Sequence, residues 1–157
     1  MFLYNYPSGR KESFKPLRGK QVSFYTCGPT VYDYVHIGNL RTFIFEDILR
    51  RSLKHEGYQV HQVMNLTDVD DKIIKRAKEE GVGIDVVTSR YSEAFFSDIK
   101  ELNIEKAEVY PAATAHVPEM IDLIKKLLKK KLAYQGKDNS IYFNIAKFKK
   151  YGRLSGL

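Results

Sequence analysis

The sequence predicts an α/β fold with a parallel sheet and flanking helices. Gln21 to Thr26 (QVSFYT) has the β-branched and aromatic residues of a buried strand, and Gly28-Pro29 stops it. A helical pattern begins at Asn39, and after a stop signal at Gly57 a second strand pattern covers Tyr58 to Leu66. A strand, a helix and another strand favour a right-handed crossover, so we expect the two strands to be parallel neighbours.

The elements before and inside this unit follow from local patterns. A short strand is expected at Phe2 to Tyr6, then a turn over residues 7–10 and a basic, solvated stretch through Lys20. The helix after Asn39 has one apolar stripe, formed by Ile44, Phe45, Ile48, Leu49 and Leu53. On its other face we expect i,i+4 ion pairs, Glu46 with Arg50 and Asp47 with Arg51.

Two helices are expected after the second strand. Thr67 and Asp70 form a capping pattern before a helix that runs from Asp70 to Glu80 and ends at Gly81. Asp85 is the expected cap of a longer helix, whose core stripe consists of Val87, Tyr91, Phe95, Ile99 and Leu102. Because adjacent carboxylates at a helix start are usually caps, we do not interpret Asp70 and Asp71 as metal ligands.

The last third of the chain has weaker patterns. Residues 103–113 are a connection with Pro111 at its centre, and a helix follows from His116 to Lys131. Residues 132–143 indicate two short strands around a turn. The lysine-rich run at residues 125–131 is interpreted either as a phosphate-backbone contact or as a solvated helix end.

Composition limits the classes of function. At 157 residues and 43% apolar content, we expect one soluble domain with one core. No apolar run approaches about 18 residues, so no membrane partner is expected. The single cysteine cannot form an internal disulfide, which indicates the cytoplasm. The formal charge of +7 is a modest indication of an anionic partner, either nucleic acid or a phosphorylated ligand.

The stretch from Cys27 to Asn39 (CGPTVYDYVHIGN) is the candidate functional site. It joins the first strand to the helix, and Gly38-Asn39 lies near the helix N-terminus, where free backbone N–H groups suit anions. The side chains of His36 and Asn39 can both donate hydrogen bonds to phosphate. The alternative is an ordinary strand–helix loop with a structural histidine. The carboxyl ends of the two strands bring Cys27 to Thr30 and Asn65 to Asp68 to one crevice, which favours the functional interpretation.

These residues resemble a known family. Cys27 to Asn39, followed by Leu40 to Phe43, resembles the signature of cysteinyl-tRNA synthetases, class I enzymes with a HIGH-type motif on a Rossmann-like catalytic domain. Asn65 to Arg76 (NLTDVDDKIIKR) resembles the family's second block. Similarity to the N-terminal part of these enzymes continues through Ala113 to Leu128, Ala133-Tyr134 and Tyr151 to Ser155.

The resemblance implies an organisation and a reaction. It implies that residues 1–132 are the first half of a Rossmann-like, HIGH-type nucleotide-binding domain, incomplete at the C-terminus, and that residues 133–157 start a truncated connective insertion. The family joins L-cysteine to ATP, supplied with magnesium, as cysteinyl-adenylate and then passes the cysteinyl group to tRNA(Cys). Such catalysis depends on positioning and charge stabilisation, with no covalent protein nucleophile.

Site residues are implied by matching to the family's motifs. Cys27 matches the first of four zinc ligands, and the zinc would take the substrate thiolate, which discriminates against serine. The residues implied to line the adenylate pocket are Cys27, Gly28, Pro29, Thr30, Thr42, Asn65, Leu66 and Thr67. The residues implied to handle ATP are His36, Gly38 and Asn39, with His36 and Asn39 as the catalytic pair.

The sequence departs from the family pattern in two respects. The motif reads His36-Ile37-Gly38-Asn39, so an asparagine replaces the final histidine; its amide still donates a hydrogen bond but carries no charge. The sequence also contains no second cysteine, no KMSKS loop and no anticodon-recognising helices, and His55, His61 and His116 do not occupy the ligand positions. We therefore expect the 157-residue chain to be inactive alone.

Three alternatives are kept. The first is a cysteine ligase of the mycothiol-synthesis type, which uses the same adenylate chemistry but an amino-sugar acceptor. The second is a non-catalytic fragment that binds tRNA or a protein partner, motivated by the net charge and the lysine run. The third is a split enzyme that a second polypeptide completes.

Overall fold

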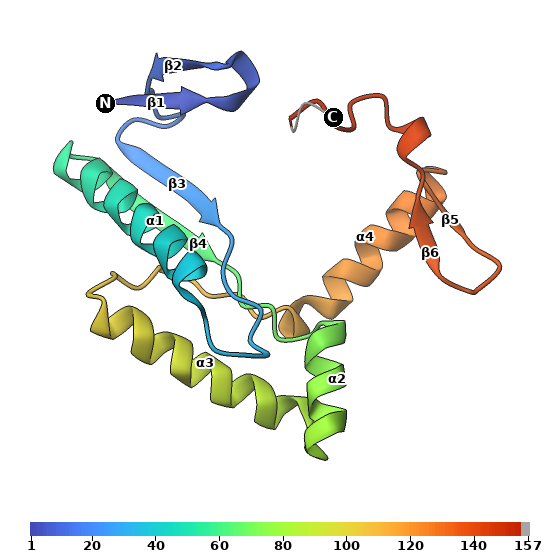
Figure 1. Ribbon diagram of the computed structural model, residues 1–157. Helices are drawn as coiled ribbons and strands as arrows, with labels where there is room; N and C mark the ends of the chain where they lie inside the picture. Colours follow the sequence, from blue (N-terminus) through green and yellow to red (C-terminus); the bar gives the residue numbers. More distant parts are fainter. Residues whose placement is uncertain (155–157) are drawn as a thin grey trace. The chain divides into compact units, whose positions relative to one another are not determined.

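The computed structural model describes residues 1–154 (Figure 1). The chain divides into two compact units. One unit comprises Pro16–His116, and the other combines Met1–Lys15 with the chain from Val117 onward. The predicted domain boundary at residues 132/133 stays a prediction. Ser155, which ends the stretch similar to the family, lies outside the described residues.

The unit Pro16–His116 is built on a parallel strand pair. Strand β3 (Gln21–Thr26) pairs with β4 (Gln59–Met64) in parallel, in a register that runs from Gln21 opposite Gln59 to Thr26 opposite Met64. Helix α1 (Ile37–His55) connects them. The predicted strand–helix–strand unit is therefore confirmed, with the helix starting two residues earlier than expected.

A third extended segment runs parallel to β4, where the sequence indicated only a connection. Bridges join Val63 with Val109 and Leu66 with Ala112. The sequence did not predict a strand here because proline donates no backbone hydrogen bond, so Pro111 argues against one. Its carbonyl oxygen still accepts a hydrogen bond from the Leu66 N–H at 2.9 Å, so the pairing survives.

Helices α2 (Asp71–Glu80) and α3 (Ile84–Glu101) fill the connection between β4 and this segment. The predicted stripe of α3 is buried at Val87, Tyr91, Phe95 and Ile99, whereas Leu102 caps the helix and is 42% exposed. The predicted capping role of Asp70 is confirmed, since it caps α2 by accepting a hydrogen bond from the Lys72 N–H, whereas Thr67 is not the N-cap. The predicted cap of α3 is wrong, because Gly83 replaces Asp85 as its N-cap.

Two apolar clusters form the core of this unit. One joins the loop residue Val31 to α2 and α3 through Ile73, Ala77, Val87 and Tyr91. The other joins α1, β4 and α3 through Phe43, Met64, Phe95, Ile99 and Ala107. The rings of Phe43 and Phe95 meet edge to face with their centroids 5.4 Å apart. Both clusters therefore hold the segment that follows β3 against α3 and its neighbours.

The predicted apolar stripe of α1 is largely wrong. Ile44, Phe45 and Ile48 are 38%, 67% and 56% exposed, while the buried face carries Phe43, Asp47, Arg50 and Leu53. Hydrophobic periodicity missed this face because half of it is charged. Of the two predicted ion pairs, Asp47 with Arg51 forms at 2.7 Å, but Arg50 turns away from Glu46 to other partners.

Those partners form a buried polar network around Arg50, whose side chain is 5% exposed. Its guanidinium donates to Glu105 at 3.1 Å, to Gln62 at 3.1 Å and to Glu108 at 2.5 Å. The Gln62 amide in turn donates to Thr26 Oγ1 at 3.0 Å. A buried cation is stable only when paired and hydrogen-bonded, so this network ties α1 to both strands and to residues 105–108.

The second unit contains small antiparallel elements and a helix. Strands β1 (Phe2–Asn5) and β2 (Arg10–Ser13) form a hairpin around the short 3-10 helix Tyr6–Ser8. β1 confirms the predicted strand, whereas β2 lies in the stretch expected to be solvated. Helix α4 (Val117–Lys129) precedes β5 (Ala133–Gln135) and β6 (Ile141–Phe143), which pair as predicted. Within residues 1–154, none of the helices combines the length and apolarity needed to cross a bilayer.

The burial of the core predicts that alanine substitution at two phenylalanines lowers the free energy of unfolding by very different amounts. Phe95→Ala is expected to lower the free energy of unfolding by about 3–5 kcal/mol, because the ring is 1% exposed. Phe45→Ala is the control on α1, where truncation of a 67% exposed ring should change it by no more than about 0.5 kcal/mol. Urea unfolding measures both values. Equal losses in the two variants would contradict the core described above.

Glu46 predicts a pH dependence of stability. Burial raises the pKa of Glu46 from 4.5 to about 6, and a hydrogen bond with Thr26 opposes the shift. The folded chain therefore holds this proton more tightly than the unfolded chain, and that stabilisation is lost as the pH rises through about 4.5 to 6. Glu46→Gln should exceed the wild type in stability by about 1–2 kcal/mol near pH 7.5 and match it near pH 4.

Urea unfolding at several pH values measures this difference. Glu93→Gln is the matched control, because Glu93 is exposed in the middle of α3. A constant offset between Glu46→Gln and the wild type at every pH would show that Glu46 does not titrate as described.

Candidate functional site

The site lies where β3 and β4 end, and it depends on a close approach of their two backbones. Pairing continues past the strands, since the Thr67 N–H donates to the Pro29 carbonyl at 3.0 Å and the Val31 N–H donates to the Thr67 carbonyl at 3.1 Å. A Cβ added at Gly28 would lie 1.9 Å from the Asn65 carbonyl oxygen. Only glycine fits at position 28, so the sequence permits this contact.

The Asn65 side chain fastens the two strand ends together. Its Oδ1 accepts hydrogen bonds from the Gly28 N–H at 3.0 Å and from the Tyr25 hydroxyl at 2.7 Å. Because Oδ1 is thereby fixed as the acceptor, Nδ2 is the donor to Thr67 Oγ1, 3.0 Å away. Asn65 therefore sets the positions of Gly28 and Thr67.

The start of α1 is closed by a reciprocal cap. His36 Nδ1 accepts a bond from the Gly38 N–H at 3.0 Å, and Asn39 Oδ1 accepts one from the His36 N–H at 3.2 Å. An imidazole whose Nδ1 accepts a hydrogen bond carries its neutral-state proton on Nε2. Each of the two capping residues therefore uses its acceptor atom in the cap and keeps a donor for a ligand. The donor is Nε2–H in His36 and the Nδ2 amide in Asn39.

A cavity of about 270 Å³ opens between these features. Of the residues implied by the resemblance, it is lined by Gly28, Pro29, Thr30, His36 and Asn39. The remaining lining residues were not among those predicted and are Tyr32, Asp33, Tyr34, Val35 and Lys72. Tyr32 to Val35 belong to the stretch Cys27 to Asn39, and Lys72 belongs to Asn65 to Arg76, so the two stretches that resemble the family were the available signal.

The other implied residues lie next to the cavity without lining it. Thr42 Oγ1 donates to the Gly38 carbonyl at 3.3 Å, and Asn65 and Thr67 bond each other as described. Leu66 packs against both apolar clusters. Gly38 leaves room for the cap, because an added Cβ would lie 2.9 Å from the His36 ring. These residues shape the backbone that surrounds the cavity.

The loop from Tyr32 to Tyr34 is held by Arg76 of α2. Arg76 Nη1 donates to the Tyr32 carbonyl at 2.7 Å and lies 3.1 Å from the Asp33 carboxylate. Its guanidinium carbon lies 5.0 Å from the centroid of the Tyr91 ring, which also meets Tyr34 edge to face. With Val31 buried among α2 and α3, the cavity wall is anchored along its length.

Cys27, the implied zinc ligand, is exposed at the end of β3. Its Sγ lies 3.8 Å from the Gly28 carbonyl oxygen. Within residues 1–154, no three His, Cys, Asp or Glu side chains gather in a way that would hold a metal ion. A tetrahedral zinc site needs four ligands, so the described residues do not form one around Cys27.

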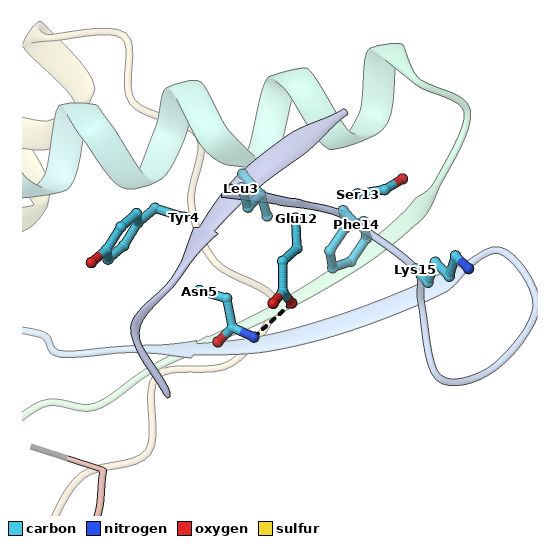
Figure 2. Close-up of a pocket in the computed structure, with 7 residues that line it drawn as sticks. All are labelled: Leu3, Tyr4, Asn5, Glu12, Ser13, Phe14 and Lys15. Carbon is cyan, nitrogen blue, oxygen red and sulfur yellow. Dashed lines mark hydrogen bonds between the residues drawn. The ribbon is translucent and has the colours of Figure 1, made fainter. Parts of the chain in front are cut away.

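A second hollow, of about 430 Å³, lies on the β1–β2 hairpin (Figure 2). Its polar lining includes Asn5, whose amide donates to Glu12 at 2.9 Å, as Figure 2 shows. Arg10 also pairs with Glu12, at 3.3 Å. Because this carboxylate is already engaged, and no predicted site residue is present, we do not assign function to the hairpin.

Comparison with known proteins gives a family and relatives. A model of the family described as tRNA synthetases class I (C) catalytic domain matches residues 13–157. A protein named "Cysteine--tRNA ligase" from Protochlamydia amoebophila is 55% identical over 99% of this chain and 32% of its own length. Proteins of the same name from Brachyspira hyodysenteriae and Chlamydia caviae are 53% and 51% identical over 99% and 100% of this chain, and 32% and 33% of their own length.

The chain spans about a third of the length of the curated relatives it matches. The predicted α/β fold with a parallel sheet is confirmed, and so is the predicted resemblance to cysteinyl-tRNA synthetases. Because the family model matches residues 13–157 and these relatives align with nearly the whole sequence, the chain belongs to the family of class I tRNA synthetase (C) catalytic domains.

Proposed function

We propose that the chain is part of a cysteine–tRNA ligase, which activates L-cysteine with ATP and transfers the cysteinyl group to tRNA(Cys). The printed name of the relatives supports cysteine and tRNA as substrates, and the class of the domain supports ATP. We further propose that ATP is supplied with magnesium, as the resemblance implies. The name also favours tRNA over the amino-sugar acceptor of the mycothiol alternative. We propose the cytoplasm as the compartment, since the sequence has a single cysteine.

One observation carries this proposal. The two stretches that resemble the family, Cys27 to Asn39 and Asn65 to Arg76, meet at a single cavity. Residues from the first stretch supply most of the lining, and Asn65 and Thr67 of the second stretch fix its backbone. Ligands of open α/β sheets bind at such strand ends.

The chain's own residues would act by binding and orientation. The Nε2–H of His36 and the Nδ2 amide of Asn39 are donors that the α1 cap holds in place, and we assign them to the phosphates of ATP. Donors that are fixed before the reaction stabilise charge that develops on the phosphates without reorganisation. Gly28 to Thr30 would orient the adenylate against the strand ends.

Zinc is the cofactor that the resemblance implies, with Cys27 as one ligand. A thiolate suits zinc chemically, and Cys27 is exposed. Because the described residues do not complete a ligand set, we assign no step of the reaction to zinc.

Cysteine-dependent exchange between ATP and pyrophosphate tests the proposal. Residues 1–157 are substituted for the matching third of the Protochlamydia amoebophila relative, to which they are 55% identical. We expect this chimaeric protein to exchange with cysteine, to ignore serine and to charge tRNA(Cys). We expect no exchange by the chain alone, since its sequence contains neither a KMSKS loop nor a second cysteine.

Each alternative has its own outcome in this assay. A folded chimaera that is silent with cysteine contradicts the proposal, and transfer to glucosaminyl-inositol instead of tRNA favours the mycothiol type. Robust exchange by the 157 residues alone contradicts the predicted inactivity. Recovery of exchange when the remaining two-thirds of the relative is added as a separate polypeptide favours a split enzyme.

The hydrogen bonds of Asn65 predict that its substitution by alanine and by aspartate have different effects on stability and kcat. Asn65→Ala leaves the part-buried Gly28 N–H without its acceptor, so we expect a loss of about 1–3 kcal/mol in stability and a lower kcat of the chimaera. Asn65→Asp keeps an acceptor for Gly28 and Tyr25 and should retain most of both properties. Hydrogen exchange of the Gly28 amide, measured by NMR, should accelerate only in the alanine variant. Identical exchange in the two variants would contradict this role.

A further inference from the structure

Lys72 is the basic side chain of the cavity that the resemblance did not assign. It lies in the first turn of α2, where its own N–H is bonded to the Asp70 carboxylate. Its ammonium lies 5.0 Å from the centroid of the Tyr32 ring, and both residues line the cavity. Among the residues described as lining this cavity, no other lysine or arginine is present.

The charge of Lys72 is not compensated by the carboxylate beside it. Asp33 is the acidic residue that lines the cavity, and Arg76 pairs with it at 3.1 Å. The same carboxylate accepts a hydrogen bond from the Tyr34 N–H at 2.9 Å. In the part of the chain that the structure describes, Lys72 has no ion pair of its own. The cavity therefore carries an unpaired positive charge held against an aromatic face.

The two capping residues of α1 line the same cavity as Lys72. His36 and Asn39 each keep an N–H donor that the cap does not use, and Lys72 supplies a cation from another element. Neutral and charged donors that converge on one small space suit an oxyanion. We propose that Lys72 binds an oxyanion group of the substrates in this cavity, either a phosphate of ATP or the carboxylate of cysteine. The inference takes these substrates from the proposed function.

The test is direct binding to the 157-residue chain, which needs no catalysis. NMR titrations at low ionic strength measure dissociation constants for ATP and for L-cysteine. Adenosine and L-cysteine methyl ester are the matched probes that lack the oxyanion. Lys72→Met removes the charge but keeps the apolar stem on Tyr32. Lys75→Met is the control, since Lys75 lies on the same helix, is 77% exposed in its side chain and does not line the cavity.

We expect Lys72→Met to raise the dissociation constant about tenfold for the probe whose oxyanion it binds, and Lys75→Met to leave it unchanged. The effect should disappear with the matching probe that lacks the oxyanion. An effect on ATP alone assigns the phosphate, and an effect on cysteine alone assigns the carboxylate. Equal binding by the wild type and Lys72→Met for both probes, or no saturable binding by the wild type, overturns the inference.

Failure of the proposed function is seen separately. If the 157-residue chain binds an oxyanion through Lys72 but the chimaera does not activate cysteine, the proposed oxyanion site is supported and the proposed ligase function is contradicted. An active chimaera whose KM values for ATP and cysteine are both unaffected by Lys72→Met would retain the ligase and contradict the site.

Discussion

The close approach of Gly28 to Asn65 is the contact on which the rest of the site depends. Parallel strands usually separate where their connections begin, but here the pairing continues to Thr67 because position 28 has no Cβ to collide with the Asn65 carbonyl. The extended pairing directs the chain so that Val31 enters the core between α2 and α3. The loop from Tyr32 to the start of α1 is therefore held at the strand end and at the helix cap, and Arg76 also holds it at Tyr32 and Asp33. A loop held at these points forms a preformed cavity.

The buried network around Arg50 stabilises the register that this contact requires. Arg50 lies on α1, and its hydrogen bonds reach Gln62 on β4 and two glutamates, Glu105 and Glu108, of the segment that follows α3. The series continues from Gln62 to Thr26, the residue before Cys27. Removing the guanidinium from water is costly, so the network tolerates little displacement of its members. A one-residue slip of β4 would expose Gln62 and turn its amide away from both partners, which makes the alternative register unfavourable.

The sequence predicted the parts of the fold in which local pattern and burial agree. The α3 stripe at Val87, Tyr91 and Phe95 is an example, since apolar residues mark its buried side. Strand β3 forms as predicted, but its buried residues are Val22 and the polar Thr26, and Tyr25 is 65% exposed. Prediction failed at α1, where the buried side carries Asp47 and Arg50 and only tertiary partners make that burial stable. In the site, the stretch Cys27 to Asn39 was recognisable as a motif. Lys72 lies in the second recognised stretch, Asn65 to Arg76, but its place in the cavity was not predicted, because only the tertiary fold brings the first turn of α2 to the loop beside His36.

The asparagine that replaces the final histidine of the motif fits the dual use of the cap. A side chain at this position must accept a bond from the His36 N–H and still offer a donor, and an amide does both while staying neutral at every pH. An imidazole can also do both, but it adds a positive charge when protonated. The Asn39 side chain therefore adds no counter-charge for a phosphate or carboxylate in this cavity, whereas Lys72, on another element, is positioned to supply one.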